Sequence, residues 1–156
     1  MFLIMRNHRR IKMTNPVAES LKTVLADSYA LYLKTQNYHW NVTGTHFAAL
    51  HALFEEHYAE LAAAIDEIAE LIRGVGEKSP GSFDAFKALT SIKTGNENAI
   101  AEAMVKELAA DHALIQKTLL LALEVAQEHE DEVIIGALTD RLTVHRKTEW
   151  MLKSSL

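Results

Sequence analysis

Metal-binding side chains recur at helical spacing in the first half of the chain. His51 and Glu55 are four residues apart, Asp66 and Glu70 are four apart, and His39 lies shortly before them. Side chains at this spacing share one face of a helix, as paired metal ligands do. The chain has no cysteine, so a metal site must use imidazole and carboxylate groups, which suit iron, manganese or zinc. The pattern predicts such a site.

The two pairs cannot close around one ion within a single helix. At the rise of an α-helix, His51 and Asp66 lie roughly 22 Å apart. Two antiparallel copies solve this, because the histidine half of one chain then meets the acidic half of its partner. Di-iron sites inside a bundle use Glu-x-x-His motifs, and none of the eight histidines follows a glutamate at that spacing. A site between subunits is therefore the main candidate.

The composition predicts an all-α fold. The chain has 156 residues, 49% hydrophobic, with two prolines and six glycines, and strand-type runs are scarce. Helical apolar spacing predicts a helix from Asn15-Pro16 to about Trp40, and a second that Thr45 caps and that ends before Gly74. A third runs from about Ile100 to Leu123 and a fourth from Val133 to Leu152.

The segment from 74 to 96 interrupts this pattern. It holds four of the six glycines and Pro80, and Ser82 is placed to cap a short helix from Phe83 to Leu89. So long a connection between the second and third long helices is typical of the single crossover of ferritin-like bundles. We therefore expect a ferritin-like four-helix bundle over residues 15–156, with a short helix in the crossover.

One stretch carries a family signature. Its residues are Tyr38-His39-Trp40-Asn41-Val42-x-Gly44, Phe47, Leu50-His51, Phe54-Glu55, Tyr58, Asp66 and Ala69-Glu70, and the last helix adds His145-x-Lys147-x-x-Trp150-Met151-Leu152. Together they resemble the Dps miniferritins, the DNA-binding proteins from starved cells. The resemblance covers residues 17–156.

That resemblance implies a hollow homo-dodecamer that oxidises ferrous iron, with hydrogen peroxide as oxidant, and stores the ferric mineral. Two irons per site would lie between subunits, with His39 and His51 from one chain and Asp66 and Glu70 from its partner. Glu55 stands where the family commonly has Asp, so it reaches further. Trp40 resembles a family tryptophan that intercepts oxidising equivalents. Such a protein protects against oxidative damage.

Charge is unevenly distributed. Residues 1–13 carry Arg6, Arg9, Arg10 and Lys12 and no acid, so the remainder holds twelve basic and twenty-one acidic residues, a net charge of −9. We expect a flexible basic arm over residues 1–14, which suits contact with DNA phosphates. The alternative is that Met13 marks a second start and the arm is dispensable.

Acidic residues at the junction between the third and fourth predicted long helices have two interpretations. Asp131 and Glu132, with Asp140 further on, either line an iron-access pore in a three-fold assembly or form a solvated turn. The apolar start is too short for a signal peptide and no segment reaches membrane-spanning length, so a cytoplasmic location is expected.

Two rival functions stay open on these residues. One is a nucleoid particle that compacts DNA through the arm, and the other is a helical interaction module without metal. The tyrosine, phenylalanine and leucine stripes are interpreted as core, and His145 as packing in or capping the last helix. The remaining histidines are interpreted as exposed or internally satisfied: His8, His46, His57, His112 and His129.

Overall fold

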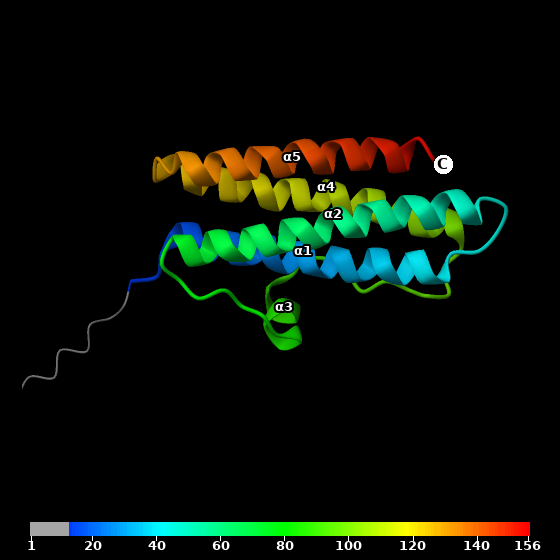
Figure 1. The fold of residues 1–156 in the computed structure, drawn as a ribbon, viewed down its shortest axis with the longest axis horizontal. Helices are drawn as coiled ribbons and strands as arrows, with labels where there is room; N and C mark the ends of the chain where they lie inside the picture. Colours follow the sequence, from blue (N-terminus) through cyan, green and yellow to red (C-terminus); the bar gives the residue numbers. More distant parts are fainter. Residues whose placement is uncertain (1–12) are drawn as a thin grey trace, which may run out of the picture.

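The computed structural model describes residues 13–156 and places five helices there (Figure 1). They are α1 (Pro16–Asn41), α2 (Phe47–Gly74), α3 (Phe83–Leu89), α4 (Ala101–Glu128) and α5 (Glu132–Lys153). No strand occurs within these described residues. The predicted fold, four long helices with a short one in the long connection, is confirmed. Arg6, Arg9, Arg10 and Lys12 lie outside the described residues.

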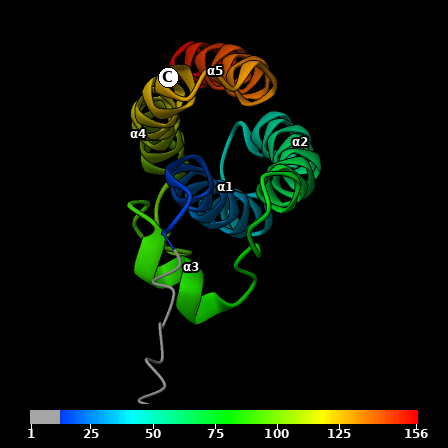
Figure 2. The same ribbon diagram turned by 90° about the vertical axis from the view of Figure 1, so that its left-hand side faces the viewer.

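The long helices form two antiparallel pairs, α1 with α2 and α4 with α5 (Figure 1). The segment between α2 and α4 returns along the bundle, so these two helices run in the same direction. Figure 2 shows α1 between α2 and α4, with α3 outside α1 on the side away from α5. The inward faces of the four long helices supply a continuous apolar core, which includes Leu25, Leu31, Phe54, Leu108, Ile115 and Leu138.

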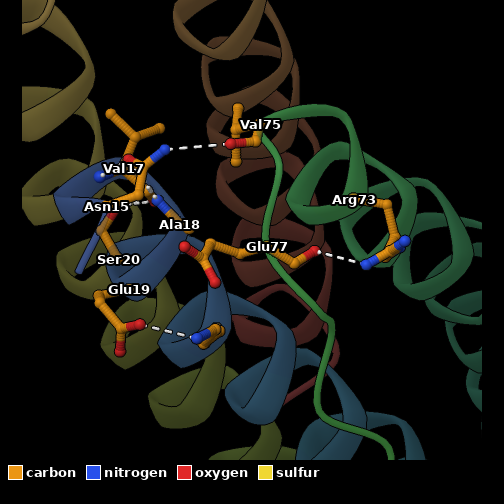
Figure 3. Close-up of polar contacts among 9 residues, drawn as sticks. Asn15, Val17, Ala18, Glu19, Ser20, Arg73, Val75 and Glu77 are labelled. Atoms are coloured by element: carbon orange, nitrogen blue, oxygen red, sulfur yellow. Dashed lines mark hydrogen bonds and ion pairs between the residues drawn. The ribbon is translucent and has the colours of Figure 1, made fainter. Parts of the chain in front are cut away.

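Asn15 fixes the start of α1, as predicted. Its Oδ1 accepts hydrogen bonds from the backbone N–H groups of Val17 (3.0 Å) and Ala18 (3.4 Å), which a helix start otherwise leaves without partners. Its Nδ2 donates to the carbonyl of Val75 at 3.2 Å. The same side chain therefore joins the start of α1 to the end of α2 (Figure 3).

The turn between α1 and α2 confirms one prediction and corrects another. Gly44 has φ +110°, the left-handed conformation that favours glycine. Thr45 does not cap α2; the cap position belongs to His46, whose side chain makes no capping bond. In this turn the Phe47 N–H donates to the Gly44 carbonyl at 3.1 Å, so the first N–H of α2 has a backbone partner.

A buried carboxylate anchors the crossover to α1. Asp27 is fully buried and accepts hydrogen bonds from Thr90 Oγ1 (2.8 Å), Ser91 N–H (2.8 Å) and Thr118 Oγ1 (2.7 Å). Two of these donors belong to the crossover and one to α4. Ser91 Oγ donates a fourth hydrogen bond, so the carboxylate charge of Asp27 is satisfied. These hydrogen bonds hold α1 in a fixed position against the crossover and α4.

Within residues 13–156, none of the helices combines the length and the apolar character that crossing a membrane requires.

Candidate metal centre

His39 and His51 lie together at the end of the bundle that carries the 42–46 turn. His39 is near the end of α1 and His51 is in the first turns of α2, and the turn folds them onto each other. Their rings stack with centroids 3.8 Å apart and an interplanar angle of 17°. His39 is 7% exposed and His51 is half-buried. The structure thus brings together the two predicted histidine ligands.

Two reciprocal hydrogen bonds set the chemistry of this pair. His39 Nδ1 lies 2.7 Å from the His51 carbonyl oxygen, and His51 Nδ1 lies 2.7 Å from the His39 carbonyl oxygen. A carbonyl only accepts, so each Nδ1 carries the proton and donates it. In the neutral imidazole the lone pair is then on Nε2. Ligating histidines commonly have this arrangement, with one nitrogen held by a backbone carbonyl and the other free.

Aromatic side chains enclose the pair on both sides. Tyr58 meets the His39 ring edge-on with centroids 5.2 Å apart, and Phe47 packs against His51 at 5.1 Å. These rings restrict the orientation of both imidazoles. Trp40 follows His39 directly but points elsewhere, since it is 62% exposed and lines a separate groove.

The predicted carboxylates lie on the surface of α2. Glu55 is exposed one turn beyond His51, and Asp66 and Glu70 are exposed near the other end of the helix. None of the three takes part in an ion pair or hydrogen bond with another described residue. Their oxygens are therefore available to a cation or to a second chain.

A single chain does not bring the two histidines together with the carboxylates Asp66 and Glu70. His51 and Asp66 belong to one continuous helix, which keeps them roughly 22 Å apart. Among residues 13–156, no group of three or more His, Asp or Glu side chains is placed to hold a metal ion.

The acidic residues around the start of α5 have different surroundings. Asp131 is the N-cap of α5 and accepts a hydrogen bond from the Ile134 N–H at 3.2 Å. Glu132 and Asp140 are exposed. Asp131 and Asp140 are roughly 13 Å apart along the helix, so within one chain they form a strip and not a cluster. Asp131 thus has a structural role whatever else it does.

The sequence did not reveal a buried polar chain across the bundle. Arg141 on α5 pairs with Glu60 on α2 through both guanidinium Nη groups, and its Nη2 donates to His145 Nε2 at 3.0 Å. His145 Nε2 must then accept, so its proton is on Nδ1 and is donated to His112 Nδ1 at 2.9 Å. The interpretation of His145 as packing in the last helix agrees with this. His112 is internally satisfied at Nδ1, as expected.

His57 departs from the expectation for isolated histidines. It is 7% exposed, yet neither ring nitrogen has a hydrogen-bond partner among the described residues. Its ring meets His112 with centroids 6.2 Å apart, beside a cavity of about 190 Å³. It is therefore neither exposed nor satisfied, and its spacing in the sequence gave no signal of this.

Burial determines the protonation of these histidines. It lowers the pKa of His112 to about 3, and the nearby His57 and Arg141 add to the effect. Burial, with His112 and Arg141 as further causes, also holds the pKa of His145 well below its usual range. The buried chain is consequently neutral at ordinary pH, except for the Arg141–Glu60 ion pair.

A groove runs along α1 beside α3 and the crossover. It has a volume of about 910 Å³ and is lined in part by Leu33, Trp40 and Phe83. These three side chains are 46%, 62% and 76% exposed. So much exposed apolar surface in one place is typical of an interaction surface.

Comparisons with known proteins agree with the fold. Residues 18–156 match the model of the ferritin-like domain family. The chain is 35% identical to DNA protection during starvation protein 2 of Bacillus anthracis over 144 residues, which is 92% of this chain and 99% of that protein.

Solved structures give the same result. The chain resembles Dps from Staphylococcus aureus with a TM-score of 0.87 and 35% identity, covering 90% of this chain and 94% of that one. It also resembles a Dps protein from Vibrio cholerae O1, with a TM-score of 0.85, 30% identity and coverage of 88% and 87%. That protein is described as a member of a broad superfamily of ferritin-like diiron-carboxylate proteins.

Proposed function

This chain belongs to the ferritin-like family and, within it, is homologous to the Dps proteins, and from that premise we propose that it oxidises ferrous iron and stores the ferric product. The proposed assembly is a hollow homo-dodecamer whose iron sites lie between subunits. The observation that carries the proposal is the His39–His51 pair, in which both Nε2 lone pairs are free for a metal.

The shared site follows from the geometry of α2. The histidine pair and the carboxylates Asp66 and Glu70 occupy opposite parts of one helix, roughly 22 Å apart. If α2 meets α2 of a second copy in antiparallel orientation, each histidine half faces an acidic half. A two-fold axis then creates two equivalent sites. The unpaired state of the carboxylates supports this arrangement, because no internal cation competes for them.

The groove beside α1 supports association of two copies. Leu33, Trp40 and Phe83 expose apolar surface next to the helix that carries His39. A second copy that covers this groove removes apolar surface from water, which stabilises the dimer by about 25 cal/mol per Å². The same contact places Trp40 in an interface near the iron site.

The ligand set suits the oxidation of iron. His39 and His51 bind ferrous iron well, whereas Asp66 and Glu70 of the partner stabilise the ferric state. Glu55 is four residues from His51, so its longer side chain contributes directly or through a water molecule. Two ferrous ions at one site supply two electrons to one peroxide, with the balance 2 Fe²⁺ + H₂O₂ + 2 H⁺ → 2 Fe³⁺ + 2 H₂O. Paired transfer avoids the release of hydroxyl radical.

A second function rests on the arm. Arg6, Arg9, Arg10 and Lys12 precede an acidic body, and a relative bears a name that refers to DNA protection. Each arm contributes weak phosphate contacts, and twelve arms on one particle would add avidity. We propose DNA binding through residues 1–14 as the alternative role, in a cytoplasmic, nucleoid-associated particle.

The test is the mass and iron content of the particle. Native mass spectrometry before and after ferrous iron and peroxide should show a dodecamer that gains a ferric core. His51→Ala should abolish the gain, while the control His46→Ala, an exposed histidine in the adjacent turn, should not. A dodecamer that gains no iron, or equal gain in both variants, would contradict the proposal.

A further inference from the structure

Three tyrosine rings on α2 and α1 continue from the histidine pair. Tyr58 contacts His39 edge-on with centroids 5.2 Å apart, and Tyr32 contacts Tyr58 at 6.1 Å and 77°. Tyr29 contacts Tyr32 at 5.8 Å and 62°. Tyr58 belongs to α2, whereas Tyr32 and Tyr29 follow each other on α1. Each ring contacts the next, so an unbroken aromatic path leads away from His39.

We propose that Tyr58, Tyr32 and Tyr29 form an electron relay that serves the iron site. The proposal rests on the iron oxidation proposed above. The relay acts when only one ferrous ion occupies a site. Reduction of hydrogen peroxide to water needs two electrons, and one ferrous ion supplies only one. The relay supplies the second electron, and the oxidising equivalent is held on a phenol instead of leaving as hydroxyl radical.

The chemistry balances with the groups already named. In the first step, Fe²⁺ + H₂O₂ + Tyr–OH + H⁺ → Fe³⁺ + Tyr–O• + 2 H₂O. The tyrosine loses one electron and its phenolic proton, and the O–O bond of peroxide is cleaved. When a later ferrous ion reaches the site, Tyr–O• + Fe²⁺ + H⁺ → Tyr–OH + Fe³⁺. The sum equals the two-iron reaction, although the ions arrive one at a time.

The surroundings of the histidine pair favour electron transfer from Tyr58 to the iron site. Phe47 covers the other side of the pair, against His51, and a phenylalanine ring has no phenolic proton to lose. Among the described residues, Tyr58 is therefore the oxidisable ring in contact with the histidine pair, through His39. Beyond it, Tyr32 accepts a hydrogen bond from Gln36 Nε2 at 3.0 Å, which fixes its hydroxyl group.

Two other residues near His39 offer discriminating controls. Tyr38 is buried, and its hydroxyl donates to Glu107 on α4, with burial as the main cause that raises its pKa to about 12. It makes no ring contact with the histidines or the other tyrosines. Trp40 is 62% exposed and lines the groove. If the aromatic path served only to pack the helices, Tyr38 or Trp40 would be the electron donor instead of Tyr58.

The experiment is freeze-quench electron paramagnetic resonance on the intact particle. The particle is loaded with one ferrous ion per proposed iron site and mixed with one equivalent of hydrogen peroxide. Ring-deuterated tyrosine narrows a tyrosyl signal and leaves a tryptophanyl signal unchanged. We expect a tyrosyl radical in the wild type and its loss in Tyr58→Phe. In Tyr32→Phe the radical should be confined to Tyr58 and decay sooner. Tyr38→Phe should retain the wild-type signal.

Phenylalanine is a suitable replacement because it keeps the ring contacts. The Tyr58 hydroxyl makes no hydrogen bond with another described residue, so Tyr58→Phe removes the redox group with little change in packing. Spin trapping of hydroxyl radical in the same mixtures should rise in Tyr58→Phe and stay at the wild-type level in Tyr38→Phe.

The outcomes separate failure of the relay from failure of the iron site. Ferrous iron is assayed in each mixture, with His51→Ala as reference. If iron is oxidised in a His51-dependent manner but no tyrosyl signal forms, or the signal survives in Tyr58→Phe, the relay is wrong and iron oxidation stands. A tryptophanyl signal alone, or loss of the signal in Tyr38→Phe, also overturns the relay. If iron oxidation does not depend on His51, both proposals fall together.

Discussion

His39 and His51 each donate Nδ1–H to the backbone carbonyl of the other at 2.7 Å. The pair therefore has two separable properties. The Nδ1 hydrogen bonds join the end of α1 to the start of α2, and the Nε2 lone pairs remain for a metal. The His39 carbonyl is among the last four of α1, which lack partners within the helix, so the His51 ring also serves as its cap.

The two properties should respond differently to substitution. His51→Asn keeps an amide N–H near the position of Nδ1 but removes Nε2, so it should abolish iron binding with little loss of stability. His51→Ala also removes the donor and should cost a further ~1–3 kcal/mol. Urea unfolding at fixed protein concentration, with ferrous binding by calorimetry, measures both. Equal stability of the two variants would show that the hydrogen bond contributes nothing.

A site shared between chains should be restored by mixing two inactive variants. His51→Ala breaks the histidine half and Asp66→Ala breaks the acidic half. After dissociation and random reassembly, half of the dimers are mixed and each contains one intact site, so about a quarter of the wild-type sites should return. The measurement is iron oxidation per particle after reassembly.

The matched control mixes two variants of the same half, His39→Ala with His51→Ala. No combination of these chains contains an intact histidine pair, so activity should stay absent. Recovery in this control, or no recovery in the first mixture despite a correct particle mass, would show that the halves are not on different chains.

The acidic strip at the start of α5 should govern iron access and not the oxidation step. Asp131→Asn, Glu132→Gln and Asp140→Asn remove charge, and asparagine retains the capping function of Asp131. Because charged openings concentrate cations in a salt-dependent way, this triple variant should take up iron more slowly and with weaker salt dependence.

The control removes the same charge elsewhere, from three exposed acids of α1 and α4: Glu19, Glu102 and Glu124. Its uptake rate should match the wild type. If the two triple variants behave alike at low salt, the residues near Asp131 are ordinary surface acids.

DNA binding should depend on residues 1–12. The rest of the chain is acidic at −9 and should repel phosphate. A chain that begins at Met13 should lose any DNA retention in gel shift at low salt but keep iron oxidation, because the proposed ligands begin at His39. Retention in both forms would assign DNA to another surface, and retention in neither would leave iron oxidation as the only proposed role.

Local signals explain why the helices were predictable. Asn15 and Ser82 cap α1 and α3 as the sequence indicated, and Gly44 takes the left-handed conformation at the predicted turn. Each signal depends on residues within a few positions. The prediction for Thr45 failed because α2 begins at Phe47, so the cap position falls on His46, one residue later than predicted.

The polar chain across the bundle was not predictable in the same way. His112 and His145 are 33 positions apart in the sequence, and Arg141 meets Glu60 across 81 positions. Their contacts depend on the rotation of α2, α4 and α5 about their axes, which apolar spacing defines only approximately. The sequence did indicate that His39 and His51 belong together, but not that each ring donates a hydrogen bond to the backbone carbonyl of the other.

The buried histidines should make the protein sensitive to mild acid. The pKa of His112 is about 3 in the folded chain and about 6.5 in the unfolded chain, and burial also lowers the pKa of His145. The unfolded state therefore binds more protons below pH 6.5, and stability is lost as the pH falls through that value toward 3. Each histidine contributes at most ~1.4 kcal/mol of loss per pH unit in this window.

The variant His112→Asn tests this slope. Its amide oxygen can accept the hydrogen bond from His145 Nδ1–H, but the side chain does not titrate. Its smaller volume should lower the unfolding free energy at pH 7.5, whereas the decline between pH 7 and 5 should be shallower than in the wild type. Urea unfolding at several pH values and one protein concentration gives both quantities, with the exposed His129→Asn as control. If His112→Asn and the wild type lose stability in parallel across this range, protonation of His112 does not limit acid stability.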